Sequence, residues 1–297
     1  MNRVLSEMRK NYQYYLLMAP FMILFFLFVV IPVVMSFVLS FTDFNMLESP
    51  NFIGLGNYIN LLVNDDVFQI ALRNTLFLAI VTGPISYFLA FILAWLINEL
   101  PKKLRAFMTL VFYAPALTGN AYLIWKIIFS GDIYGFINSR LIDFGFINEP
   151  IQFLSNPQYI MPVLIIVQLW MGLGISFLAF RAGLQGVDKS MYEAGAIDGI
   201  KNRWLELWYI TLPAMKPQLI FGAVMQISSA FALSAISVEM VGFPSTDYAG
   251  HTIITHLMDF GSIRYELGYA SAIATVLFVI MIVTNLFVQK MIRKVGS

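Results

Sequence analysis

Apolar stretches without charge recur along the whole chain and are separated by short polar segments. Six runs contain no charged residue: 11–42, 74–98, 106–125, 150–180, 217–238 and 267–289. Each run reaches the roughly 20 residues with which an α-helix crosses about 30 Å of hydrocarbon. Because backbone groups in lipid must bond within their own segment, the pattern predicts six transmembrane helices. We expect them at about 14–41, 71–98, 105–129, 159–182, 216–241 and 265–292.

The runs lack the apolar–polar alternation that is typical of membrane β-strands. The predicted fold class is therefore an all-α membrane protein, with a single transmembrane domain over residues 1–297 and its core helices at about 71–292. Gly172 and Gly174 are expected to weaken or bend the fourth helix. The first apolar run is longer than the core of a signal peptide, so it is expected to remain as a membrane helix.

Composition agrees with a membrane protein. Hydrophobic residues make up 59% of the chain and charged residues 12%, with a mean hydropathy of +0.78, whereas soluble domains carry roughly 25% charged residues. The chain has no cysteine, which excludes a disulfide framework and a cysteine metal site. With a net charge of only +1, no nucleic-acid partner is expected.

Lysine and arginine divide unevenly between the two sets of connecting segments. The side that includes the N-terminus holds 14 of the 18 basic residues: Arg3, Arg9, Lys10, Lys102, Lys103, Arg105, Arg181, Lys189, Lys201, Arg203, Lys216, Lys290, Arg293 and Lys294. The other side holds only Arg73, Lys126, Arg140 and Arg264. Cytoplasmic loops carry the excess of basic residues, so both termini are predicted to be cytoplasmic.

The polar segment 183–215 separates the fourth and fifth predicted helices. Ser190 and Glu193 have the spacing of a capping box, which predicts a helix start there. The small residues 194–196 leave a narrow waist that another backbone can approach, and Gly199 ends the short helix. From pattern alone the segment is either an ordinary cap on the bundle or a docking element for another protein.

This segment resembles the EAA loop of permease subunits in ABC importers that depend on a solute-binding protein. The family pattern is Glu-Ala-Ala, three residues, Gly, nine residues and Ile-x-Leu-Pro. Here it reads Glu193-Ala-Gly195, Gly199 and Ile210-Thr-Leu-Pro213. Two features depart from it: Gly195 replaces alanine, and ten residues separate Gly199 from Ile210. The extra residue is expected in the turn between two short helices.

The resemblance extends along nearly the whole chain to sugar-importer permeases of the maltose and glycerol-phosphate type. It includes residues 52–58, 74–75, 172–174, 182–185 and 192–199. It implies the type I ABC importer permease fold in the bacterial plasma membrane. The residues that it implies in coupling to the ATPase are Glu193, Ala194, Gly195, Asp198, Gly199, Leu212 and Pro213.

The same resemblance implies the partners. A second, homologous permease completes the pathway, two ATPase subunits lie beneath, and a solute-binding protein delivers a sugar from outside. For the second permease, a separate gene product is favoured over a second copy of this chain. No phosphate-binding G-x-x-x-x-G-K-[ST] motif occurs. ATP and Mg²⁺ are therefore expected in the partner ATPase, and this chain is expected to be neither an enzyme nor a holder of a cofactor.

Polar and aromatic side chains within the predicted helices are candidates for the substrate pathway, because such groups at membrane depth face a cavity or a partner helix. The candidates are Asn120, Tyr122, Gln168, Trp170, Gln226 and Glu239. They suit a neutral, hydroxyl-rich cargo such as an oligosaccharide. A charged sugar stays open, since the second permease contributes half of the cavity. Hydrogen bonding between helices is the alternative role.

Two other functions make different demands on the sequence. An ion-coupled secondary transporter or channel needs intramembrane carboxylates, and only Glu239 comes near this requirement. An intramembrane enzyme needs a motif such as H-E-x-x-H or G-x-S-x-G, and neither occurs. His251 and His256 are five residues apart, a spacing that does not place both imidazoles on one helical face, so no metal site is expected.

Overall fold

The computed structural model describes residues 10–294, which are mostly helical. Within this range the only β-pairing recorded is an isolated bridge between Thr42 and Phe52. The all-α prediction is confirmed. Arg3 and Arg9, two of the basic residues assigned to the cytoplasmic side, lie outside the described residues.

Within residues 10–294, five helical segments are long and apolar enough to cross a membrane, and there are six if one bent pair counts as a single span. The six predicted spans agree with this count when the bent pair is included. In chain order the spans are α2 (Tyr12–Phe25), η1 (Phe26–Val30) and α3 (Ile31–Leu39); α5 (Asp66–Asn98); α6 (Lys102–Leu117) and α7 (Tyr122–Ile128); α9 (Pro157–Met171) and α10 (Gly174–Gly186); α14 (Lys216–Phe231) and α15 (Ser234–Val241); and α17 (Leu267–Ile292).

Three of these spans are interrupted. The break at Gly172–Leu173 between α9 and α10 lies where the glycines predicted it. By contrast, α6 and α7 meet at 87°, so the continuous helix predicted at 105–129 is wrong. Thr118 is extended there, with φ −101° and ψ 100°, and Gly119 has low helix propensity. A third break, at Ala232–Leu233, has no glycine or proline to signal it.

Contacts divide the described chain into two compact units, one of residues 10–64 and 257–276 and one of residues 65–256 and 277–294. In the first unit, the outer loop after α3 leads into α4 (Gly56–Ile59) and η2 (Asn60–Asn64). Asn57 is buried, and its Nδ2 donates to the carbonyls of Ser40 at 2.9 Å and Thr42 at 2.8 Å. This amide therefore anchors the loop to the end of α3.

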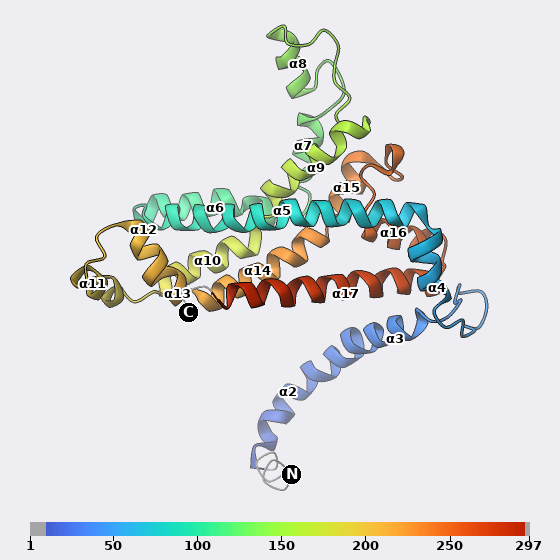
Figure 1. Ribbon diagram of the computed structural model, residues 1–297, viewed down its shortest axis with the longest axis horizontal. Helices are drawn as coiled ribbons and strands as arrows, with labels where there is room; N and C mark the ends of the chain where they lie inside the picture. Colours follow the sequence, from blue (N-terminus) through green and yellow to red (C-terminus); the bar gives the residue numbers. More distant parts are fainter. Residues whose placement is uncertain (1–9, 295–297) are drawn as a thin grey trace. The chain divides into compact units, whose positions relative to one another are not determined.

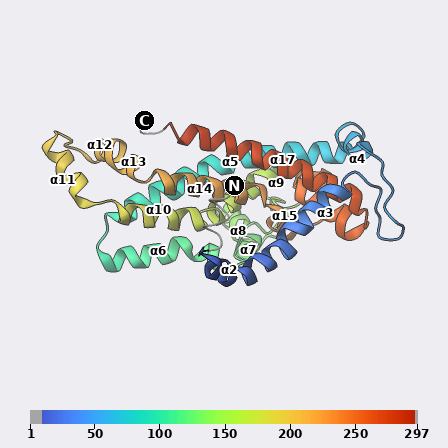
Figure 2. The same cartoon turned by 90° about the horizontal axis from the view of Figure 1, so that it is seen from below.

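The second unit is built around α5, α10 and α14, which lie side by side with α6 alongside α10 (Figures 1 and 2). Phe180 is fully buried between these helices and packs edge-to-face on Tyr87 at 5.2 Å and Phe91 at 5.6 Å. A second core forms around Leu164 and Val167, where α7, α9 and α15 meet. The short helices of the connecting segments extend from these packed helices.

Shorter helices lie in the connecting segments of the two units. They are α8 (Phe136–Asp143), α11 (Lys189–Ile197), α12 (Arg203–Glu206), η3 (Leu207–Thr211), α13 (Leu212–Ala214), η4 (Thr246–Tyr248), α16 (Ile253–Met258) and η5 (Asp259–Ile263). Of these, α8 lies in the segment between the third and fourth spans.

Candidate functional site

The segment predicted at 183–215 folds into a polar arm, here residues 188–214, beyond the end of α10 (Figures 1 and 2). Its first helix, α11, begins after Asp188, whose carboxylate accepts a hydrogen bond from the Ser190 amide at 3.0 Å. This bond favours the charged form and lowers the pKa of Asp188. The capping box predicted at Ser190 and Glu193 is wrong, because Asp188 caps the helix instead.

A Schellman motif ends α11. Gly199 has φ +92°, a conformation that only glycine adopts readily. The Ile200 amide donates to the Gly195 carbonyl at 2.9 Å, and the Gly199 amide donates to the Ala196 carbonyl at 3.3 Å. Gly199 therefore ends the helix as predicted, and these bonds satisfy the last carbonyls of the helix.

Gly195 is buried, and the side chains that cover it, Ile200 and Ile210, belong to the same arm. A Cβ at this position would lie 2.6 Å from Ile210 Cδ1 and 3.3 Å from Ile200 Cδ1. On this side, the narrow waist predicted for the approach of another backbone is occupied by Ile210 of the same chain. Glu193, Ala194 and Asp198 are exposed on the arm, so the surface open to a partner lies beside Gly195.

The helix that carries Ile210 contains a π-helical turn, η3, directly before Leu212 and Pro213. Such turns occur as local bulges in α-helices and hold one residue more than an α-helical turn. This turn offers a second place, besides the turn after Gly199, where the extra residue before Ile210 can be accommodated. Leu212 and Pro213 follow half-buried and lead into α14.

Two of the predicted pathway residues lie in the interior between the broken helices. Gln168 on α9 and Gln226 on α14 are only 3% and 2% exposed. Gln168 Nε2 donates to the Ser229 carbonyl at 3.3 Å, and Gln226 Oε1 accepts from Ser176 Oγ at 3.3 Å. Both glutamines therefore form hydrogen bonds between helices, which is the alternative role that the sequence left open for them.

Further polar atoms converge on Gly172, at the break between α9 and α10. A Cβ built there would lie 2.8 Å from the Gln168 carbonyl oxygen, 3.0 Å from Ser86 Oγ and 3.1 Å from Gln226 Nε2. Ser86 Oγ and Gln226 Nε2 are buried and have no hydrogen-bond partner among the described residues. Ser86, Gln168, Gly172, Ser176 and Gln226 together form the interior polar cluster.

Sequence reasoning missed Ser86 and Ser176. The available signal was that both are hydroxyl residues in otherwise apolar helices, at positions close to Pro84 and Gly174 respectively. Serine is too common in membrane helices for that signal to select these two alone.

The other predicted pathway residues do not join this cluster. Asn120 is exposed in the break between α6 and α7, and its Oδ1 accepts from the hydroxyl of the buried Tyr122 at 3.2 Å. Trp170 is half-buried and packs edge-on against Trp125 at 5.6 Å. Glu239 is exposed near the end of α15.

The two histidines meet despite their spacing. His251 Nε2 and His256 Nδ1 are 3.2 Å apart, and His256 Nε2 lies 3.0 Å from Asp65 Oδ2. The imidazoles approach because His251 precedes α16, so that helical periodicity does not govern the pair. Over the described part of the chain, no group of three or more candidate ligands could hold a metal ion.

The apolar spans, three of them broken, and the folded arm between the fourth and fifth spans define a multi-pass membrane protein. No protein-family model matches the chain. It is 31% identical to the probable ABC transporter permease protein YesP of Bacillus subtilis, over 98% of this chain and 93% of the relative. It is 32% identical to the arabinooligosaccharides transport system permease protein AraP of the same bacterium, over 93% and 87%. The chain therefore belongs to the family of ABC transporter permeases.

Further similarities agree with this assignment. The lactose transport system permease protein LacF of Rhizobium radiobacter is 34% identical over 74% of this chain and 73% of its own length. A bacterial alginate ABC transporter, solved in complex with an alginate pentasaccharide-bound periplasmic protein, contains a chain with a TM-score of 0.79 and 21% identity, covering 99% of both chains. The importer permease fold is thus confirmed, and the chain is a multi-pass protein of the bacterial inner membrane.

Proposed function

We propose that this chain is the transmembrane permease subunit of an ATP-driven sugar importer. A solute-binding protein delivers the sugar to this importer from outside the cell. The observation that carries the proposal is the polar arm, which presents Glu193, Ala194 and Asp198 on a short, rigidly capped helix. Relatives whose names specify arabinooligosaccharides and lactose support a sugar, and an oligosaccharide in particular.

The arm couples the chain to two cytoplasmic ATPase subunits, which bind and hydrolyse ATP with Mg²⁺. The proposed coupling residues are Glu193, Ala194, Gly195, Asp198, Gly199, Leu212 and Pro213. The exposed ones contact the ATPase, while buried Gly195 and half-buried Leu212 and Pro213 join the arm to the rest of the chain. The excess of basic residues on these segments supports a cytoplasmic position for the arm and for both termini. This chain has no nucleotide motif of its own, and it contributes no cofactor and no enzymatic step.

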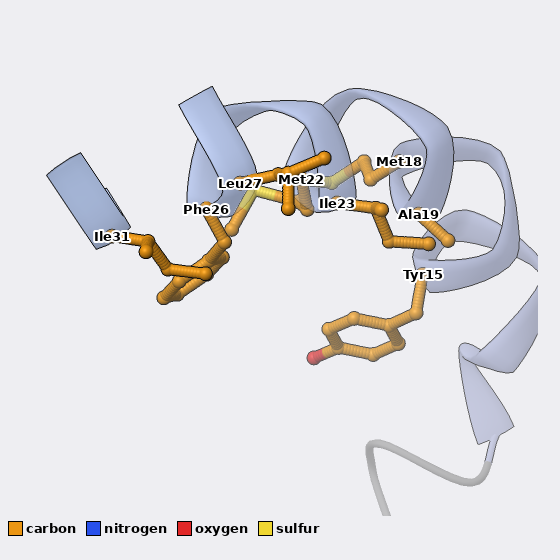
Figure 3. A pocket seen from close by; sticks show the side chains of 8 residues that line it. All are labelled: Tyr15, Met18, Ala19, Met22, Ile23, Phe26, Leu27 and Ile31. Carbon is orange, nitrogen blue, oxygen red and sulfur yellow. The ribbon is translucent and has the colours of Figure 1, made fainter. Parts of the chain in front are cut away.

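A second permease completes the pathway. The first span offers a surface for it, because α2, η1 and α3 bury none of their described residues within this chain. Along this span a hollow of about 690 Å³ is lined entirely by apolar and aromatic side chains (Figure 3): Tyr15, Met18, Ala19, Met22, Ile23, Phe26, Leu27 and Ile31. The homologous permease and lipid are the two partners proposed for this face.

The sugar passes between the two permeases, past the breaks in the spans. Asn120, Tyr122, Gln168, Trp170, Gln226 and Glu239 remain the proposed pathway residues. Amide and aromatic groups suit sugar hydroxyls and ring faces. A loaded binding protein promotes transport only by preferring the outward-open state, because a ligand shifts an equilibrium by its difference in affinity for the two states.

Reconstitution tests this function. The chain, its second permease and the ATPase are placed in liposomes with ATP inside, and a labelled oligosaccharide is added outside with the binding protein. Uptake should require ATP hydrolysis and should be lost in Glu193→Ala, with membrane insertion unchanged. Uptake by this chain without an ATPase, driven by an ion gradient, would instead establish the secondary transporter.

A further inference from the structure

Arg181 is a buried cation near the end of α10. Its residue is 5% exposed, and its Nη1 donates to Asn98 Oδ1 at 2.9 Å. Its Nε is buried and has no hydrogen-bond partner among the described residues. A guanidinium is always charged, and removing it from water is costly unless an anion compensates it.

The neighbourhood of Arg181 adds positive charge. Arg105 lies close enough for electrostatic repulsion with Arg181, while its own guanidinium donates to the Leu100 carbonyl at 3.1 and 2.9 Å. Across residues 10–294, neither arginine forms an ion pair with an aspartate or glutamate. Among the described residues, Arg105 and Arg181 therefore have no counter-ion.

A polar cavity of about 370 Å³ lies beside this pair, and Asn98 and Arg105 line it. Lys102 and Lys189 line it as well, and neither forms an ion pair within the described chain. The two acids on its wall, Glu99 and Glu206, are both occupied by Arg203, at 2.9 and 3.0 Å. Three cations thus remain for a ligand, with Arg181 held directly behind Asn98.

We propose that this cavity binds a phosphate-bearing anion. Arginine and lysine are the usual ligands of phosphate oxygens, and the anion would compensate Arg105 and Arg181 together. The same chemistry is offered by the headgroup of an anionic phospholipid and by a soluble phosphate compound. This inference goes beyond the transport function. It rests on the proposed cytoplasmic position of the arm only where it places the cavity at the cytoplasmic surface of the membrane.

The surroundings suit a lipid headgroup. Trp95 lines the cavity and packs against Trp204 at 5.4 Å, and tryptophan is enriched at the membrane–water interface. Basic pockets between transmembrane helices on the cytoplasmic side are recognised binding places for acidic headgroups. Tyr192 and Thr211 of the polar arm also line the cavity, so the anion would join the arm to α5 and α6.

The test uses the complete transporter in nanodiscs of phosphatidylcholine with a minor fraction of phosphatidylglycerol. Native mass spectrometry counts the phosphatidylglycerol retained by wild type, Arg181→Met, the double variant Lys102→Gln/Lys189→Gln and the control Lys290→Gln. Lys290 is an exposed lysine on α17 that does not line the cavity. We expect retention to fall about tenfold or more in the double variant, given the attraction that each basic residue exerts on acidic lipid, and to stay unchanged in Lys290→Gln.

A second experiment adds inorganic phosphate to the transporter in discs of phosphatidylcholine alone and measures the thermal midpoint of unfolding. A phosphate-dependent rise that disappears in the cavity variants assigns the site to a soluble ligand, and either source upholds the proposal. The proposal is overturned if Lys290→Gln loses as much lipid as the cavity variants, or if no variant has an effect in either experiment. It is also overturned by an Arg181→Met complex that is more stable than wild type and retains the same lipid. Because binding is measured without transport, failure here is distinct from failure of the transport function.

Discussion

The hydroxyl of Tyr192 lies 2.9 Å from Thr211 Oγ1, joining α11 to the π-helical turn of the polar arm. Thr211 is 2% exposed and also donates to the Glu206 carbonyl at 3.2 Å. Motion of α11 is thereby linked to the helix that continues into α14.

Removing that bond should weaken coupling while the fold survives. Tyr192→Phe deletes one hydrogen bond of about 1 kcal/mol. We expect the complex to assemble, with reduced stimulation of ATP hydrolysis by the loaded binding protein. Tyr209→Phe is the matched control, because Tyr209 lies exposed on η3 with no hydrogen bond described for its hydroxyl. Equal behaviour of the two variants would rule out a coupling role for the bond.

Gly195 should tolerate a small side chain and reject a branched one. In Gly195→Ala the new methyl meets Ile210 Cδ1, the flexible end of a side chain that can rotate away. We expect most of the uptake to remain. Gly195→Val should lose uptake, because overpacking of this kind costs about 1–3 kcal/mol. The measurement is sugar uptake normalised to protein in the membrane, and full activity of the valine variant would contradict this packing.

Gly199 should be required for docking to the ATPase. A residue with a Cβ at its positive φ costs roughly 1–2 kcal/mol, so Gly199→Val distorts the end of α11. We expect co-purification of the ATPase to be lost. Gly145→Val imposes similar strain, at φ +72°, in the loop after α8. That control should still bring down the ATPase, and loss of the ATPase from both variants would point to general destabilisation.

Gly172→Ala tests the interior polar cluster. Its methyl would lie 2.8 Å from a backbone oxygen, which cannot rotate away, so about 1–3 kcal/mol of stability should be lost. The thermal midpoint should fall, and uptake should fall with it. Gly174→Ala is the control, since its methyl would make an ordinary 3.4 Å contact with Ala116 Cβ. A complex with Gly172→Ala that is as stable as this control would refute the close approach.

The cap of α11 should depend on pH. The hydrogen bond from Ser190 lowers the pKa of Asp188 below its unfolded value, so its stabilising effect is complete above that unfolded value. It is lost as the pH falls through the lower, folded value, below about 4. The protection of the amides of residues 189–197 against hydrogen exchange, relative to intrinsic exchange at the same pH, should therefore fall at acidic pH. Asp188→Asn keeps a neutral cap, and its protection should depend less on acid. Identical profiles would remove Asp188 from the explanation.

The sequence by itself determined the membrane class, the number of spans and the location of the polar arm. These features are local: a run of uncharged residues must satisfy its own backbone in lipid, and Gly199 ends a helix wherever its neighbours lie. The break at Gly172 was also readable, because glycine weakens a helix by itself. Similarity of residues 193–213 to a known loop supplied the family, which the comparisons then confirmed.

Only the tertiary structure decided how these elements are used. The direction in which Gly195 faces depends on Ile210, fifteen residues away, and the break at Ala232–Leu233 has no local signal. The convergence of Ser86 and Gln226 on Gly172, and of Arg105 on Arg181, joins residues on different helices. Such relationships arise from the packing of helices against one another, which the spacing of residues along one helix does not encode.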